Sequence, residues 1–488
     1  MKRRDFLKQS SAALALATLS RSTTAQAPGS KPMNLLFITA DDMNWSMPGF
    51  MGGKYNLTPR LDELAKRSHR FVNNRTAAAI CQPSREAIMT GLVPHRSGGL
   101  GFTPVHEGTP TLASVLHEHG YFTGCIHKLE HMQPESCFPW DYKIPGKDRN
   151  PLEYESGVRE AISQARTAKK PFFIICNIND PHRPFYGSHG AAGVDHNETG
   201  PYRIPRVLQG NDVEAPSFLE DLPPIREEFA QYCNSVQRLD GTIGKVLAVL
   251  ESSAEANNTM VVFCSDHGMP FPFSKATCYN NGTREPVLLS WPGMGPAKSF
   301  EENTCNVDIL PTLLDILHVP SPEGIDGRSW MPIVEGHPQS NREYVVTSIN
   351  TIHSKMAYPM RAIQNMRYSF FISPWSDGKL RFNVESMQGL TYKAMAEAAK
   401  TDAGIAARVK QYIYGFPMAF YDLEKDPDQR VNAIHAPEYR KQIAEMKHLL
   451  LEEMERTNDP QLGNYKALLA GGKPTVIEQV TTQARRNP

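Results

Sequence analysis

The chain has 488 residues, and its 52 lysines and arginines balance its 52 aspartates and glutamates. A net charge of zero gives no overall field that would recruit nucleic acid or an anionic membrane, so we expect no nucleic-acid partner. The eight cysteines are scattered without the spacing of a structural metal site, and a full disulfide framework is not expected.

The first 27 residues resemble a twin-arginine export signal. Arg3 and Arg4 precede Phe-Leu-Lys, and the apolar stretch that follows, residues 12–19, is too short to span a bilayer. Small residues then form a cleavage region, in which a cut after Ala25 is preferred because Pro28 would block one after Ala27. The pattern predicts export through the twin-arginine translocase to the periplasm or beyond, without stable insertion in the membrane.

Residues 28–335 alternate short apolar runs with helical patterns, which is typical of an α/β domain. The expected strands are 34–40, 121–126, 172–178, 259–264 and 287–290. One helix is expected from Pro59, after the cap residue Thr58, and a longer one over 229–250. The Gly- and Pro-rich stretch 187–224 is interpreted as a wall of the substrate cleft, with a surface excursion as the alternative.

The pattern changes near residue 335. Short strands at 344–347, 360–363 and 368–372 precede a charged helix at 436–456, which predicts a smaller α+β subdomain over 336–460 that completes the cleft. Residues 461–488 are expected to be a tail. The predicted fold is therefore a mostly parallel mixed sheet sandwiched by helices, with this smaller subdomain at its C-terminal end.

Polar residues follow four of the expected strands. Asp41 and Asp42 follow the first, Lys128 the second, Asp180-Pro181-His182 the third, and Asp266-His267 the fourth. Ligands of open α/β sheets bind outside the carboxyl ends of the strands, so these distant segments are expected to meet in one site.

The acidic members of this group predict a metal site. Asp41 and Asp42 are adjacent carboxylates that repel each other unless a cation lies between them. Asp266 adds a third carboxylate and His267 a nitrogen, which together suggest one divalent cation, most simply Ca²⁺. Because calcium prefers oxygen, the nitrogen of His267 widens the choice toward Mg²⁺ or Mn²⁺.

The segment from Cys81 to Arg85 reads CQPSR, and Thr90-Gly91 follows it. This C-x-P-S-R-x-x-x-x-T-G pattern resembles the maturation motif of the type I sulfatases of the alkaline phosphatase superfamily, and the likeness covers about 33–460. The resemblance implies the alkaline-phosphatase/sulfatase-like fold. It also implies that a formylglycine-generating maturation enzyme converts Cys81 to formylglycine. One hydroxyl of the aldehyde hydrate would attack sulfur, and the other would expel sulfate from a covalent sulfo-enzyme intermediate.

Four further segments resemble the N-sulfoglucosamine sulfohydrolases, or sulfamidases. They are 265–272 (SDHGMPFP), 180–183 (DPHR), 358–361 (YPMR) and 421–427 (YDL with DP). They imply a sulfated saccharide substrate, preferably N-sulfoglucosamine of heparin or heparan fragments. The alternatives are an O-sulfatase for another polysaccharide such as an algal one, a phosphodiesterase or phosphonate hydrolase of the same superfamily, and an inactive carbohydrate-binding relative whose Cys81 remains a thiol.

The resemblance also implies a role for each site residue. Asp41, Asp42, Asp266 and His267 would hold calcium, although the sulfamidase pattern has Asn where His267 stands. Arg85 and Lys128 would stabilise the nucleophile and the sulfate, while His182 and Lys275, which replaces an expected arginine, would bind sulfate and protonate the leaving group. His131 would be the base, with His127 as runner-up because Glu130 takes the usual place of the histidine. His353 and Arg361 would contact the sugar.

Overall fold

The computed structural model describes residues 31–189, 199–352 and 356–476. The expected export signal and His353 lie outside the described residues. Within the described part, no helix combines the length and the apolar character needed to cross a membrane. All eight cysteines lie in the described part, and each is unpaired.

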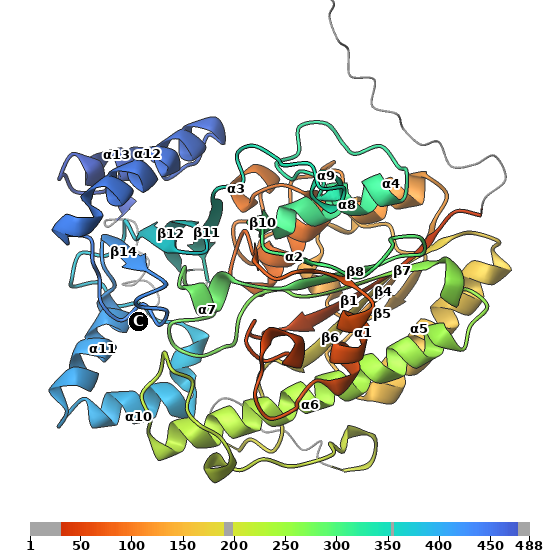
Figure 1. The fold of residues 1–488 in the computed structure, drawn as a ribbon, viewed down its shortest axis with the longest axis horizontal. Helices are drawn as coiled ribbons and strands as arrows, with labels where there is room; N and C mark the ends of the chain where they lie inside the picture. The colour runs from red at the N-terminus through yellow and green to blue at the C-terminus, as the bar shows by residue number, and fades with distance from the viewer. Residues whose placement is uncertain (1–30, 190–198, 353–355, 477–488) are drawn as a thin grey trace, which may run out of the picture. The chain divides into compact units, whose positions relative to one another are not determined.

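The central element is an eight-stranded sheet with the order β5-β4-β6-β1-β7-β8-β2-β9 (Figure 1). Five neighbouring strands are parallel: β5 (Tyr142–Ile144), β4 (Phe122–Ile126), β6 (Phe172–Pro181), β1 (Asn34–Asp41) and β7 (Thr259–Ser265). Strand β8 (Val287–Ser290) is antiparallel to both β7 and β2 (His69–Phe71), and β9 (Ser299–Phe300) is parallel to β2. The expected mostly parallel mixed sheet is confirmed.

Helices cover both faces of this sheet (Figure 1). Alternate residues of β1 face opposite sides, so that Leu36 and Ile38 lie in one core and Leu35 and Phe37 in another. Burial on both faces explains why the parallel strands read as continuous apolar runs. The first core includes residues of α1 (Pro59–Lys66), α5 (Pro151–Thr167) and α6 (Pro223–Glu251); the second includes residues of α2 (Cys81–Thr90), α4 (Leu112–Glu118), α8 (Ile309–Ile316) and α9 (Met331–Val334).

A second, antiparallel sheet has the order β11-β12-β13-β14. Its strands are β11 (Val345–Thr351), β12 (Ala357–Gln364), β13 (Tyr368–Ile372) and β14 (Met418–Asp422), with α10 (Leu390–Ala398) and α11 (Ala403–Tyr414) between the last two. Phe371 packs in the first core of the large sheet, whereas its neighbour Phe370 packs with α12 (Arg440–Arg456) and α13 (Leu462–Leu469). The described fold therefore continues into the expected tail, because Tyr465 of α13 is completely buried.

Other short elements of the described chain include α3 (Pro94–Ser97), α7 (Asn280–Thr283), the paired strands β3 (Asn74–Arg75) and β10 (Thr304–Cys305), and several 3₁₀ helices. The described part of the stretch 187–224 packs along α6. The side chain of Asn234 in α6 bonds both backbone polar groups of Leu208, and Phe218 and Leu219 join the core. Residues 214–218 line a cavity of about 450 Å³ with Trp45 and Met269, and this cavity is separate from the acidic residues described next. The interpretation of this stretch as a wall of the substrate cleft stays a prediction.

Candidate active site

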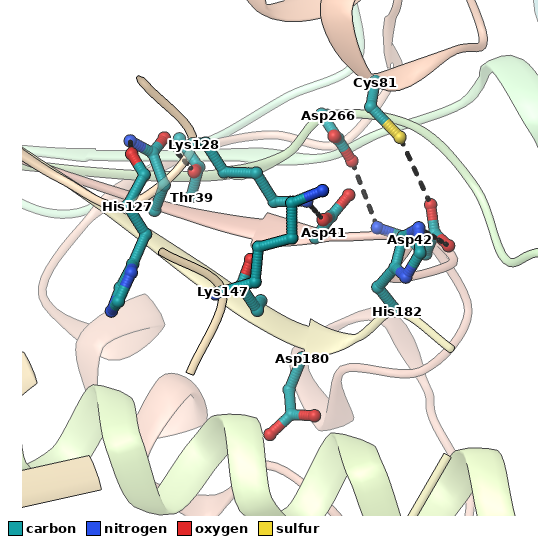
Figure 2. A network of polar contacts seen from close by, with 12 residues as sticks. Thr39, Asp41, Asp42, Cys81, His127, Lys128, Lys147, Asp180, His182 and Asp266 are labelled. Carbon is teal, nitrogen blue, oxygen red and sulfur yellow. Dashed lines mark hydrogen bonds and ion pairs between the residues drawn. The ribbon is translucent and has the colours of Figure 1, made fainter. Parts of the chain in front are cut away.

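The polar residues that follow the parallel strands meet at one edge of the sheet (Figure 2). Lys128, His182, Asp41 and Asp266 lie at or just beyond the ends of β4, β6, β1 and β7, which are neighbours in the sheet in that order. The chain adopts positive φ at Asp42 (73°) and Lys128 (57°), a conformation that non-glycine residues seldom adopt and that is concentrated at functional sites.

Cys81 is the first residue of α2 and points into this group. Its Sγ lies 3.2 Å from Nε2 of His267 and 4.0 Å from Oδ1 of Asp42. Burial raises the pKa of the Cys81 thiol well above its usual value, and although Lys275 opposes this, the neighbouring aspartates add to it. An unmodified thiol here would stay protonated and would be a weak nucleophile.

Four side chains converge as possible ligands for one cation. Asp41, Asp42, Cys81 and His267 each offer a donor atom, and these atoms all lie within 4.8 Å of one another. Oδ1 of Asp41 is buried without a hydrogen bond, whereas Oδ2 pairs with Nζ of Lys128, so Oδ1 keeps lone pairs for a cation. Nδ1 of His267 lies 3.0 Å from the carbonyl oxygen of Gly268. Because a carbonyl only accepts, Nδ1 carries the proton, and in the neutral ring Nε2 is free to act as a ligand. The two carboxylates and the nitrogen of this set fit a divalent cation, and the fourth donor is the sulfur of Cys81.

Asp266 borders this set and shapes it. Its Oδ1 accepts the backbone N–H groups of Asp42 (3.1 Å) and His267 (3.0 Å) and lies 3.8 Å from Nε2 of His267. Its Oδ2 accepts a bond from Nε of Arg85 at 3.1 Å. Burial raises the pKa of Asp266, although His267 and Arg85 act in the opposite direction.

Arg85 is buried and tethers three strands. Its Nη1 donates to Thr39 of β1 at 2.9 Å and to Asn177 of β6 at 2.7 Å, while Asp266 follows β7. Its Nη2 lies 3.7 Å from Oδ1 of Asp41. The first role of Arg85 in this structure is thus to hold the acidic residues in place.

Lys128 forms a buried ion pair with Asp41. Burial alone would raise the pKa of Asp41, but Lys128, with His182 and Arg85, lowers it well below its usual value. Asp41 is therefore ionised even without a metal, with Lys128 as its buried partner.

The structure distinguishes the two candidate bases. His131 lies in the short 3₁₀ helix Leu129–His131, where burial, Lys128 and Arg85 lower its pKa well below the usual value. His127 instead points away from Cys81 and Asp42 (Figure 2). Its ring packs on Tyr154, with centroids 4.8 Å apart. His131 is thus the candidate whose pKa is shifted by the site residues Lys128, Arg85 and Asp41.

One residue that the sequence did not indicate joins the site from the second subdomain. Glu385 lies in the 3₁₀ helix Glu385–Gln388, and its carboxylate is 3.3 Å from Nζ of Lys275 and 3.9 Å from Nε2 of His182. No strand end or motif marks Glu385, so only the tertiary structure reveals it. The same two side chains approach Asp42, Lys275 at 3.0 Å and His182 at 3.9 Å.

Arg361 does not join the site, which corrects the expectation that it contacts the sugar. Its guanidinium is completely buried and pairs with Asp459 at 2.5 and 2.9 Å. The remaining bonds go to Asn350 and to the carbonyl groups of Ile349 and Met360. These partners occupy all the donors of a guanidinium group and leave none for a saccharide.

Comparison with known proteins gives two family matches. The Sulfatase family model matches residues 33–319, and the model for the C-terminal part of N-sulphoglucosamine sulphohydrolase matches residues 266–375. Human N-sulphoglucosamine sulphohydrolase is 28% identical over 470 residues, which cover 88% of this chain and 91% of that protein. A delta 4,5-hexuronate-2-O-sulfatase of Bacteroides thetaiotaomicron is 24% identical and covers 92% of this chain and 94% of its own length. The resemblance carried by the motifs is confirmed.

Solved structures show the same fold. A 2-O GAG sulfatase superimposes with a TM-score of 0.65 and 22% identity, covering 88% of this chain and 93% of that one. A protein in complex with its substrate D-glucosamine-2-N,6-O-disulfate gives a TM-score of 0.66 at 18% identity, covering 88% of this chain and 99% of that one. The expected α/β fold of this superfamily, with its smaller second sheet, is confirmed.

Proposed function

The chain belongs to the sulfatase family and hydrolyses sulfate from sulfated sugars, and we propose that its preferred substrate is N-sulfoglucosamine of heparin or heparan fragments. The observation that carries the chemistry is the position of Cys81, which starts α2 with its Sγ beside His267 and Asp42. The match of residues 266–375 to the sulfamidase C-terminal model supports the choice of substrate.

The nucleophile in this proposal is formylglycine, made from Cys81 by a maturation enzyme. Its hydrate would supply a hydroxyl that attacks sulfur and a second hydroxyl whose loss of a proton re-forms the aldehyde and frees sulfate. The N-terminus of α2 favours negative charge at this position, because the dipole of a helix is positive at its start. His131 is held neutral by burial and the cations beside it, so it is suited to accept that proton.

The proposed metal site comprises Asp41, Asp42 and His267, with Asp266 beside them. We propose Ca²⁺, with Mg²⁺ or Mn²⁺ as the alternatives. A bound cation would neutralise sulfate oxygens and favour the ionised nucleophile.

Lys275 and His182 are given different roles. Burial opposes the charge of Lys275, yet Asp42, Cys81 and Glu385 raise its pKa well above the usual value, so it keeps its proton and binds sulfate. The Nδ1 of His182 is held 2.6 Å from the carbonyl oxygen of Arg183, which leaves Nε2 to face the site. Burial and Lys275 lower the pKa of His182, so its Nε2 carries a proton only in the imidazolium form, and we propose that this form protonates the leaving atom.

The substrate is tested on glucosamine that carries a single sulfate at N, O-3 or O-6. The matured enzyme should release sulfate fastest from the N-sulfated sugar, as measured by ion chromatography. The second candidate is a carbohydrate O-sulfatase, favoured by Lys275, which lacks the planar two-pronged grip of the arginine expected there. Turnover of an O-sulfated sugar alone would establish that candidate.

Export is proposed from residues 1–27, which resemble a twin-arginine signal. Replacing Arg3 and Arg4 by lysine should leave active enzyme in the cytoplasm, measured as sulfatase activity in cell fractions. Unchanged activity in the periplasmic fraction would refute this route.

A further inference from the structure

Two carboxylates, Asp42 and Glu385, alternate with Lys275 and His182 in a closed ring at the accessible edge of the site. Asp42 approaches Lys275 at 3.0 Å and His182 at 3.9 Å, and Glu385 approaches the same two residues at 3.3 and 3.9 Å. Asp42, Lys275 and His182 belong to the first domain, whereas Glu385 is supplied by the segment between β13 and α10. The second subdomain therefore contributes a charge directly to the site.

The members of the ring differ in exposure. The side chain of Glu385 is 28% exposed and that of His182 27%, whereas Lys275 is 6% exposed and Asp42 is completely buried. When a saccharide enters with its sulfate toward Cys81, the part of the sugar ring next to the sulfate therefore contacts Glu385 and His182.

Glu385 is an anion in this setting. Burial raises the pKa of its carboxyl group, but Lys275 and His182 lower it to about 2. A carboxylate beside the cations that bind sulfate weakens the attraction for any anion, and an ionised carboxylate can only accept hydrogen bonds. Its partners on a sugar are hydroxyl and amino groups.

We propose that Glu385 is a specificity-determining residue that accepts a hydrogen bond from a neutral hydroxyl or from an amino group beside the scissile sulfate and repels a second sulfate or a carboxylate there. The inference deepens the proposed function and rests on it. The expected substrate is a saccharide whose cleaved sugar carries one anionic group, the scissile sulfate. Lys275 then has a second role, which is to orient the carboxylate of Glu385.

The test compares singly and doubly sulfated glucosamine. Calorimetric titration of the inactive Cys81→Ala protein should show stronger binding of glucosamine N-sulfate than of the N,6-O- and N,3-O-disulfates. The measured quantity is the ratio of the affinity for glucosamine N-sulfate to the affinity for each disulfate. Adding Glu385→Gln, which keeps the shape of the side chain and removes its charge, should change this ratio at least tenfold in favour of a disulfate. Glu385→Asp should keep the rejection of the disulfates, because it keeps the charge. Glu397→Gln, an exposed residue of α10, is the matched control and should leave the ratio unchanged.

The kcat/KM values of the matured enzyme for the same sugars are then measured, and their ratio is compared between the variants. An unchanged ratio in Glu385→Gln would overturn the inference and leave Glu385 as a brace for Lys275. Absence of binding of every sugar by the Cys81→Ala protein would also overturn it. Normal binding without release of sulfate from any sugar would refute the proposed function alone.

Discussion

Cys81 lies where its thiol has little reactivity of its own, because burial and three aspartates hold its pKa high. Replacing it by alanine should reduce sulfate release to background, since a methyl group cannot be converted to a hydrated aldehyde. Cys81→Ser should also be inactive in a host whose maturation enzyme accepts only cysteine. Sulfate release is measured together with the melting temperature, which should change little in either variant. The same release from Cys81→Ala as from the natural protein would refute the formylglycine mechanism.

Asp41 is the carboxylate best placed to report metal binding, because its Oδ1 is buried without a hydrogen bond. Ca²⁺ added to metal-free protein at a hundredfold excess over its Kd should stabilise the folded state by about 2.7 kcal/mol. The stabilisation should be seen as a rise in the melting temperature. Asp41→Asn should abolish most of this rise and reduce activity by orders of magnitude, with partial rescue at high Ca²⁺.

The control for this experiment is Asp315→Asn, which removes an exposed carboxylate of α8 and should keep the full response to Ca²⁺. An equal response to Ca²⁺ in Asp41→Asn and in the natural protein would contradict the metal assignment.

The buried carboxyl group of Glu86 should make the stability of the protein depend on pH. Burial raises the pKa of this carboxyl group from 4.5 to about 9, even though Gln82 donates a hydrogen bond to it. The folded state therefore holds the proton more tightly than the unfolded state. The resulting stability is fully present below pH 4.5 and is lost as the pH rises through 9. Between these values each pH unit costs about 1.4 kcal/mol.

Glu86→Gln removes this titration. The melting temperature of the variant should exceed that of the natural protein by an amount that grows from pH 5 to pH 8, measured by calorimetry. Glu118→Gln, at the end of α4, alters an exposed glutamate and serves as the control. Parallel curves for Glu86→Gln and the natural protein would show that Glu86 is ionised when folded.

At the scale of elements, a buried ion pair holds the end of β6 that carries His182. Asp180 accepts bonds from Nε and Nη2 of Arg238 in α6 at 2.7 and 2.9 Å, and a further bond from Nε of Arg149 at 3.2 Å. Arg238→Met should destabilise the protein by roughly 3–5 kcal/mol, because it leaves a buried carboxylate with only part of its partners. It should also lower kcat, because the position of His182 depends on this strand end.

The measurement is urea unfolding with a parallel assay of activity. Arg159→Met, which removes an exposed pair with Glu155 in α5, is the control and should cost about 0–1 kcal/mol. Equal losses in the free energy of unfolding for the two variants would mean that the Asp180–Arg238 pair contributes no more than a surface contact.

The sequence predicted the strand ends well and the contacts between distant elements poorly. Asp41, Lys128, His182 and Asp266 could be placed together because each follows an apolar run, and parallel strands end at the same edge. Glu385 could not be found in this way, since its segment shows no periodic pattern and reaches the site only through packing of the second sheet. The sugar contact expected of Arg361 came from the resemblance of segment 358–361, and its partner Asp459 could not be foreseen because it is distant in the chain.

At the scale of the whole molecule, the small sheet joins two cores through its opposite faces. Phe371 and Tyr421 face the catalytic domain, whereas Phe370 and Phe420 face α12 and α13. The outer layer therefore stabilises the sheet from which Glu385 is supplied, and only its helix α13 lies in the stretch that the sequence pattern placed in a tail.

Tyr465 tests this outer layer. Its side chain is completely buried in α13, and its hydroxyl donates to the carbonyl oxygen of Lys447 in α12 at 2.9 Å. Tyr465→Ala should lower the free energy of unfolding by about 3–5 kcal/mol, the usual cost of removing a buried aromatic ring. Leu469→Ala, in the same helix but 39% exposed, should cost far less. Urea unfolding measures both. At 25 °C the folded Tyr465→Ala protein should keep its activity, because the ring packs against the sheet face opposite to the catalytic domain. A loss of activity with unchanged stability would instead mean that α13 acts on the site itself.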